Sequence, residues 1–163
     1  MLVRETLQEI VTLQKSYDAS KTPEMDRRGS LIRRTLPAEI QSISPELRQA
    51  LGVYGEDAQV EGKDNQGQMS RIPWVRWFSD SRSPSATSGW YVVYLFHPDG
   101  SGVSLCLSHG STEIVGTGFV NRSDAEVAEL MSWATGVLGS EFEADPDIRL
   151  GISLGRFDLA RGY

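Results

Sequence analysis

The sequence predicts an α+β domain: a central, mostly antiparallel sheet with N-terminal helices and one later helix packed on it. Three patterns predict this class. Apolar residues recur at helical spacing near the N-terminus, a period of two dominates the middle of the chain, and a second helical pattern follows. The strands are grouped instead of alternating with helices, which disfavours a doubly wound parallel fold. At 163 residues the chain is long enough for its own core, so we expect a single domain over residues 1–163.

Two helices are expected before the sheet. Residues 2–18 carry apolar side chains at intervals of three and four, and a second helix is expected over 24–36 with Pro23 in its first turn. The outer side of the second helix is expected to carry four arginines: Arg27, Arg28, Arg33 and Arg34. These arginines form either an ordinary solvated helix face or a surface that contacts phosphates.

Proline and glycine predict the next boundaries. Pro37 is expected to interrupt the helical pattern, and Ser44 followed by Pro45 is typical of the start of a short helix that Gly52 would close. Residues 53–62 alternate only weakly. The KDNQGQ segment that follows has the composition of a hairpin turn or a loop.

The stretch from residue 67 to residue 111 is the most informative part of the chain because it holds three of the four tryptophans. In its first strand, Trp74, Arg76 and Phe78 should point to one side, and Val75 and Trp77 to the other. A serine-rich loop at 79–88 leads to a second aromatic strand, which a PDG turn folds back as a hairpin. The rings are either buried on both faces of the sheet or line a pocket for a flat ligand such as a nucleobase.

The last part of the chain is expected to begin with a helix. Ser123 and Glu126 have the spacing of a capping box, and apolar residues continue at helical spacing to about Leu138. An acidic loop should follow, and residues 148–154 and 157–159 suggest one or two final strands.

The distribution of charge is more informative than its sum. The net charge is −6, whereas a general nucleic-acid-binding protein is usually basic. Residues 113–147 contain eight acids and a single basic residue, so the acidity is confined to that segment. Basic residues gather in 21–34 and 71–82, which leaves room for one face that tolerates phosphates.

The chain offers few groups for catalysis, so we expect no catalytic residue, no metal and no cofactor. Cys106 and His109 are three apart on one strand and therefore on opposite faces. No glycine-rich phosphate loop or nucleophile elbow is present. A single cysteine fits a reducing cytoplasm, and with no signal-peptide or membrane-spanning pattern we expect a soluble cytoplasmic protein.

Three segments together resemble a known family. They are Ile72-Pro73-Trp74, the strand from Gly89 to Phe96, and the return strand from Gly102 to Leu107, and they are similar to the MrcB-like N-terminal domain. This module is the DNA-recognition part of modification-dependent (type IV) restriction systems. The resemblance implies binding of double-stranded DNA that contains 5-methylcytosine or a related modified cytosine, with a nuclease or nucleotide-driven motor linked to the domain in the full-length protein.

The resemblance also implies a pocket for an extruded base. Its tryptophan corresponds to Trp74, its aliphatic wall to Leu95, and the position of its tyrosine to Gln66, which departs from the pattern. Tyr91 or Trp90 would then stack on the base instead. The residues expected to contact the DNA backbone are Arg71, Arg76, Arg82, Ser81, Ser83, Arg33 and Arg34, with Ser79 and Ser85 as further neutral donors.

Two other functions are compatible with the same residues. The first is a sensor that binds a small molecule or a modified nucleoside and not duplex DNA. The net negative charge of the chain slightly favours this function. The second is an interaction domain that docks to another chain. Salt dependence separates DNA binding from both, because phosphate contacts weaken steeply as salt rises.

Overall fold

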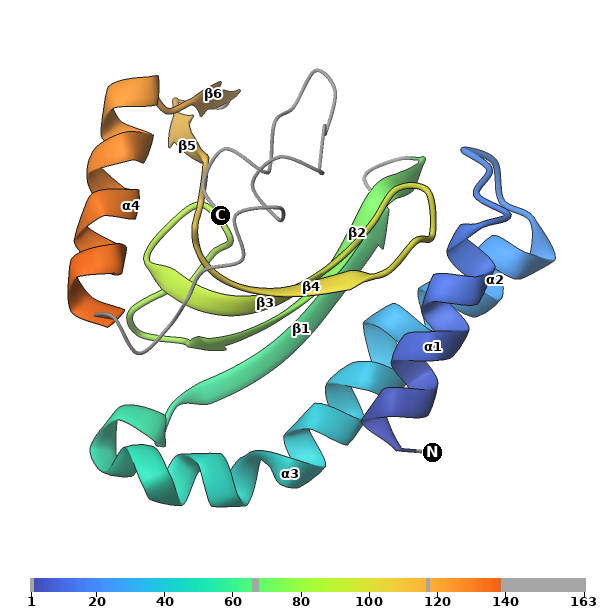
Figure 1. The fold of residues 1–163 in the computed structure, drawn as a ribbon, viewed down its shortest axis with the longest axis horizontal. Coiled ribbons are helices and arrows are strands. Elements are labelled where there is room, and N and C mark those ends of the chain that lie inside the picture. Colours follow the sequence, from blue (N-terminus) through green and yellow to red (C-terminus); the bar gives the residue numbers. More distant parts are fainter. Residues whose placement is uncertain (1, 66–67, 117, 139–163) are drawn as a thin grey trace.

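The computed structural model describes residues 2–65, 68–116 and 118–138. In these residues, helices α1, α2 and α3 precede a four-stranded antiparallel sheet of order β1-β2-β3-β4, which is followed by a β5-β6 hairpin and helix α4. Figure 1 shows α1–α3 along one face of the sheet and α4 at the end of the sheet away from α1 and α2. The α+β class is therefore confirmed. The acidic loop and the final strands predicted at 148–154 and 157–159 lie outside the described residues.

The first N-terminal helix ends earlier than residue 18, where it was predicted to end, and the second runs further than predicted. Helix α1 spans Val3–Gln14 and α2 spans Pro23–Ser30, where the Thr22 side chain accepts a hydrogen bond from Met25 N–H. A π-helical turn, η1 (Leu31–Thr35), joins α2 directly to α3 (Leu36–Leu51). The predicted interruption at Pro37 and the separate helix starting near Ser44 are therefore wrong.

The π-helical turn explains why Pro37 does not break the helix. The Leu36 N–H donates to the Leu31 carbonyl, five residues back, so this turn holds one residue more than an α-helical turn. Pro37 then follows this wider turn directly, at the start of α3, where its fixed φ is compatible with a helix. Gly52, with a φ of 55°, ends α3 as predicted.

The sheet has the alternation that the sequence predicts. Its strands are β1 (Ala58–Asn65), β2 (Met69–Ser79), β3 (Trp90–Phe96) and β4 (Val103–His109). Val75 and Trp77 of β2 face the helices, whereas Trp74 and Phe78 belong to the opposite face. We call the side opposite α1–α3 the second face of the sheet.

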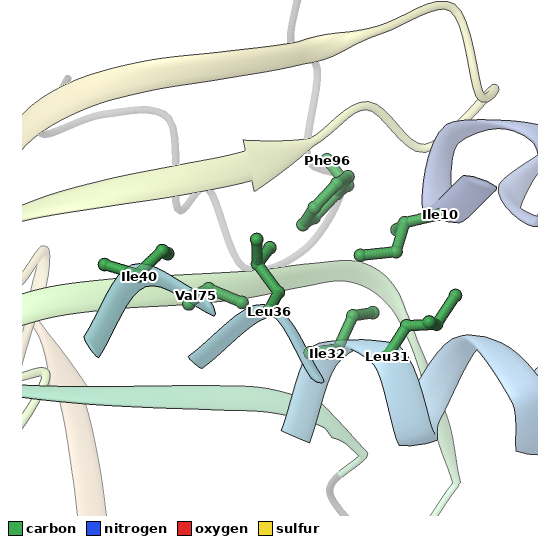
Figure 2. Close-up of a cluster of buried hydrophobic side chains, with 7 residues drawn as sticks. All are labelled: Ile10, Leu31, Ile32, Leu36, Ile40, Val75 and Phe96. Atoms are coloured by element: carbon green, nitrogen blue, oxygen red, sulfur yellow. The ribbon is translucent and has the colours of Figure 1, made fainter. Parts of the chain in front are cut away.

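The main core lies between the helices and the sheet. Figure 2 shows the seven buried side chains that form it: Ile10, Leu31, Ile32, Leu36, Ile40, Val75 and Phe96. The helical layer approaches the sheet most closely at Gly62, where an added Cβ would lie 1.9 Å from the Ile32 carbonyl oxygen. Glycine at this position lets η1 lie directly against the backbone of β1.

Arg28 is buried, not exposed as predicted. Its guanidinium donates to Gln14 Oε1 at 2.6 Å and to the Ser70 carbonyl oxygen at 3.0 Å, and it lies 5.7 Å from the centre of the Tyr17 ring. Desolvation lowers its pKa below the ordinary arginine value. Arg28 therefore ties α1 and α2 to β2, because a charge placed in the interior needs hydrogen-bond partners.

The described part of the chain ends with a hairpin and a helix. The hairpin consists of β5 (Thr112–Val115) and β6 (Gly118–Asn121), and the helix is α4 (Asp124–Leu138). The capping box is confirmed: Glu126 Oε2 accepts from Ser123 N–H at 2.8 Å, and Ser123 Oγ accepts from Glu126 N–H at 3.3 Å. The hairpin was not predicted. Within the described ranges, no helix combines the length and the apolar character needed to cross a lipid bilayer.

Candidate functional site

The second face of the sheet contains three rows of cross-strand neighbours. In chain order across β1 to β4, the rows are Lys63–Trp74–Leu95–Ser104, Glu61–Arg76–Val93–Cys106 and Gln59–Phe78–Tyr91–Ser108. Trp74 and Leu95, the two pocket positions implied by the family resemblance, are therefore direct cross-strand partners.

The serine-rich loop covers the end of this face that holds the third row. Tyr91 Oη donates to the Ala86 carbonyl oxygen at 2.9 Å, and Ser83 Oγ donates to the Ser88 carbonyl oxygen at 2.7 Å. The backbone turns back to the sheet at Gly89, which has a φ of 73°. Tyr91 and Ser83 are both buried by this arrangement.

Arg76 holds the loop to the sheet. Its side chain is 1% exposed; it donates to Glu61 Oε1 at 2.7 Å and to the Ser83 carbonyl oxygen at 3.0 Å. The guanidinium carbon lies 3.7 Å from the centre of the Phe78 ring, which adds a cation–π contact. Arg76 and Ser83 are thus internal supports, and neither side chain reaches a surface where a phosphate would lie.

Asp57 anchors the other end of the loop. One of its carboxylate oxygens accepts from Ser81 Oγ at 2.5 Å, Ser81 N–H at 2.8 Å and Ser79 Oγ at 2.9 Å. These bonds, first of all that from the Ser81 hydroxyl, lower the pKa of Asp57 from 3.8 to about 2. Ser81 remains exposed, but its hydroxyl already donates to this carboxylate.

We expect Asp57 to make the stability of the fold depend on acid pH. Its pKa is lower in the folded chain than in the unfolded chain, so its stabilising contribution is complete above pH 3.8 and is lost as the pH falls towards about 2. In urea titrations, the difference in unfolding midpoint between the unaltered chain and Asp57→Asn should be constant near neutral pH and shrink over that interval. A difference that does not change with pH would contradict this origin.

The opposite end of the second face, around Trp74, differs from the loop-covered end. Leu95 is 1% exposed and forms the floor beside the partly buried Trp74. Ser104 is the next neighbour across the sheet, and its Oγ lies 2.9 Å from His97 Nε2. Lys63, which is exposed, flanks Trp74 on the β1 side. This end therefore combines an indole, an aliphatic floor, a hydroxyl–imidazole pair and a cation.

The sequence reasoning missed Lys63, His97 and Ser104. His97 and Ser104 could have been predicted from the alternation of side chains along the strands. His97 is two residues from Leu95 and so shares its face, and Ser104 pairs with Leu95 across the hairpin that was correctly predicted. The position of Lys63 beside Trp74 could not be predicted, because it depends on the register between β1 and β2. That register contains an irregularity between Lys63 and Asn65.

The remaining predicted pocket residues are not together. Tyr91 lies on the second face but two rows from Trp74, beneath the loop. Trp90 points to the other side of the sheet, where it contacts His109 and Trp133 with ring centres 5.2 Å apart in both pairs. Gln66 lies outside the described residues.

The predicted phosphate-binding arginines are also divided. Arg71, Arg82, Arg33 and Arg34 are exposed. Arg71 lies on the helix side, 5.9 Å from the centre of the Tyr17 ring, and Arg33 is paired with Asp64 of β1. Arg82 is in the serine-rich loop near Asp57. Any phosphate contacts would therefore come from the margins of the sheet and from its loop, not from one continuous basic patch.

Among the residues that the structure describes, the second face holds neither an activated thiol nor a cluster of metal-ligating side chains. Burial raises the pKa of Cys106 to about 11, so its thiol is protonated at neutral pH and is a weak nucleophile. Across the described residues, no three His, Cys, Asp or Glu side chains come together as they would around a metal ion. What this end of the sheet can do is bind: an indole and an aliphatic floor suit a flat ring, and the polar groups beside them suit its edge.

The chain is an α+β domain, with helices α1–α3 on one side of its sheet and the aromatic side chains of the second face on the other. The family described as MrcB-like, N-terminal domain matches residues 12–163, and the chain belongs to this family. Comparisons with curated proteins and with solved structures returned no match.

Proposed function

We propose that this domain binds double-stranded DNA containing 5-methylcytosine or a related modified cytosine, using the Trp74 end of the second face. The observation that carries the proposal is the pairing of Trp74 with Leu95, at the two positions that the family resemblance assigns to the pocket. In the full-length protein the domain would direct a linked nuclease or motor to modified DNA, with catalysis in another domain.

The groups around Trp74 suit an extruded base. An indole stacked on a nucleobase contributes about 1–3 kcal/mol, and burying one methyl group adds about 0.8 kcal/mol. A base that leaves the duplex also needs hydrogen-bond partners for its Watson–Crick edge. The Ser104 hydroxyl, which lies 2.9 Å from His97 Nε2 on the same side as Leu95, can make one further hydrogen bond, whereas His97 Nδ1 is already engaged by Ser101 Oγ at 3.0 Å.

Discrimination by the methyl group alone is modest. A gain of about 0.8 kcal/mol corresponds to a ratio of roughly four in affinity, so further selectivity must come from rejecting the unmodified base or from reading its neighbours. Extrusion itself costs a few kcal/mol, which backbone contacts must offset. We assign this role to the exposed Lys63, which is the β1 neighbour of Trp74, and to the exposed Arg82 of the serine-rich loop.

The test is a binding panel with one duplex that carries cytosine, 5-methylcytosine or 5-hydroxymethylcytosine at a single position. We expect the methylated duplex to bind at least about fourfold more tightly than the unmodified one at fixed salt. Affinity for all three should fall steeply with salt, because phosphates supply much of the binding. Equal affinity for the three duplexes would contradict modification reading. Salt-independent binding of the free modified nucleoside alone would favour the small-molecule sensor.

A further inference from the structure

A second aromatic cavity lies at the other end of the molecule, between β3 and α4. It has a volume of about 450 Å³ and six lining residues: Trp90, Arg122, Glu126, Glu129, Leu130 and Trp133. Trp90 faces away from Trp74, because the two side chains extend from opposite sides of the sheet. This cavity is therefore separate from the proposed base site.

The two indoles form its apolar wall. Their ring centres are 5.2 Å apart with an angle of 31° between the planes, and the His109 ring meets Trp90 edge-on at 5.2 Å. His109 thus supports Trp90 from the neighbouring strand. Trp133 is 55% exposed, an unusual position for the largest apolar side chain in a domain that buries smaller ones. Part of the Trp133 indole is therefore accessible in the wall of the cavity.

The charges around the cavity are predominantly negative. The Arg122 side chain donates to the Gly110 carbonyl oxygen at 3.0 Å and the Thr87 carbonyl oxygen at 3.3 Å, and it lies 3.6 Å from Glu113. The positive charge of Arg122 is thus balanced within the domain, by Glu113 and in part by Glu126, whose pKa it helps to lower.

Two carboxylates of α4, those of Glu126 and Glu129, line the cavity. Hydrogen bonds from Ser123, first of all from its hydroxyl, lower the pKa of Glu126, so this group is ionised at neutral pH. Glu129 makes no hydrogen bond or ion pair with the part of the chain that the structure describes. Both carboxylates belong to the acidic segment 113–147, which would repel DNA phosphates.

We propose that this cavity binds an organic cation, namely a guanidinium or alkylated ammonium group held against Trp90 and Trp133 and neutralised by Glu126 and Glu129. An aromatic wall attracts a cation through the ring quadrupole, and an adjacent carboxylate adds direct charge attraction. The cation is either a free small molecule or an arginine or lysine side chain on a basic segment of a protein partner. The proposal does not depend on DNA recognition.

The experiment follows tryptophan fluorescence and heat of binding with three probes: tetramethylammonium, agmatine and a short arginine-rich peptide. Neopentyl alcohol, a water-soluble neutral compound with a tert-butyl group in place of the trimethylammonium group, is the control ligand. We expect the cations to bind and the alcohol not to bind. We expect Glu129→Gln to weaken cation binding about tenfold, and Trp133→Ala to abolish it. Because both side chains are exposed, circular dichroism should show both variants to be folded.

Each outcome is informative. Binding of tetramethylammonium or agmatine supports a free cation, and binding of the peptide alone supports a basic protein segment. Trp74→Ala should leave cation binding unchanged, which separates this site from the proposed base site. The proposal is overturned if neither the small cations nor the peptide bind, if the alcohol binds as well as tetramethylammonium, or if Glu129→Gln has no effect.

Discussion

Replacing Arg76 by methionine is expected to lower the free energy of unfolding by about 3 kcal/mol. The side chain is 1% exposed, and its removal leaves the buried carbonyl oxygen of Ser83 without its donor. The cation–π contact with Phe78, at 3.7 Å, is lost as well. Methionine fills much of the same volume, so the loss reports on the polar contacts more than on a cavity.

The matched control is Arg82→Met, the same exchange at an exposed position in the loop that Arg76 supports. We expect its unfolding free energy to stay within about 0.5 kcal/mol of the unaltered chain. If Arg82 contacts a phosphate, its replacement should also make the slope of log affinity against log salt concentration shallower by about one. Urea unfolding and salt titration measure the two effects. An Arg76→Met variant as stable as Arg82→Met would show that the buried arginine is not a support.

Trp74→Ala is expected to weaken binding of the methylated duplex by about 5- to 150-fold, which corresponds to the roughly 1–3 kcal/mol of one base–aromatic stack. The indole is partly exposed beside Leu95, so a base that stacks on it would gain both the ring contact and the aliphatic floor. Trp74→Phe keeps a ring in place and should recover part of the affinity. This variant also guards against a general loss of folding.

Trp90→Ala is the matched control, because it removes a tryptophan of the same sheet that lies on the side opposite Trp74. It should leave DNA affinity unchanged while weakening the binding of organic cations. Fluorescence anisotropy with methylated and unmodified duplexes measures the first effect. If Trp74→Ala is folded and binds both duplexes as the unaltered chain does, Trp74 is not part of the site.

Local patterns predicted much of this fold because they depend on neighbours along the chain. The alternation of Trp74, Val75 and Phe78, the turn between β3 and β4, and the capping box at Ser123 are all confirmed. Each rests on interactions within a few residues, where backbone geometry leaves few alternatives. The wrong helix break at Pro37 marks the limit of such rules. A single π-helical turn shifted the register by one residue and made the proline acceptable.

The candidate site was predicted only in part. Trp74 and Leu95 were expected together from the resemblance, and the register of β2 with β3 pairs them. Trp90 and Tyr91 are adjacent in sequence, but their side chains leave opposite sides of the same strand, so they cannot share one pocket.

The sequence by itself determined the class of the fold, the faces of its strands and its family, because these depend on periodicity and on motifs read along the chain. Only the tertiary structure decided which charges are internal. Arg28, Arg76 and Arg82 are the same residue type, yet the first two are buried and the third is exposed, and exposed Arg27 is the direct neighbour of buried Arg28. The physical reason is that the burial of a guanidinium depends on acceptors brought to it from distant strands and loops, and no local pattern records those distances.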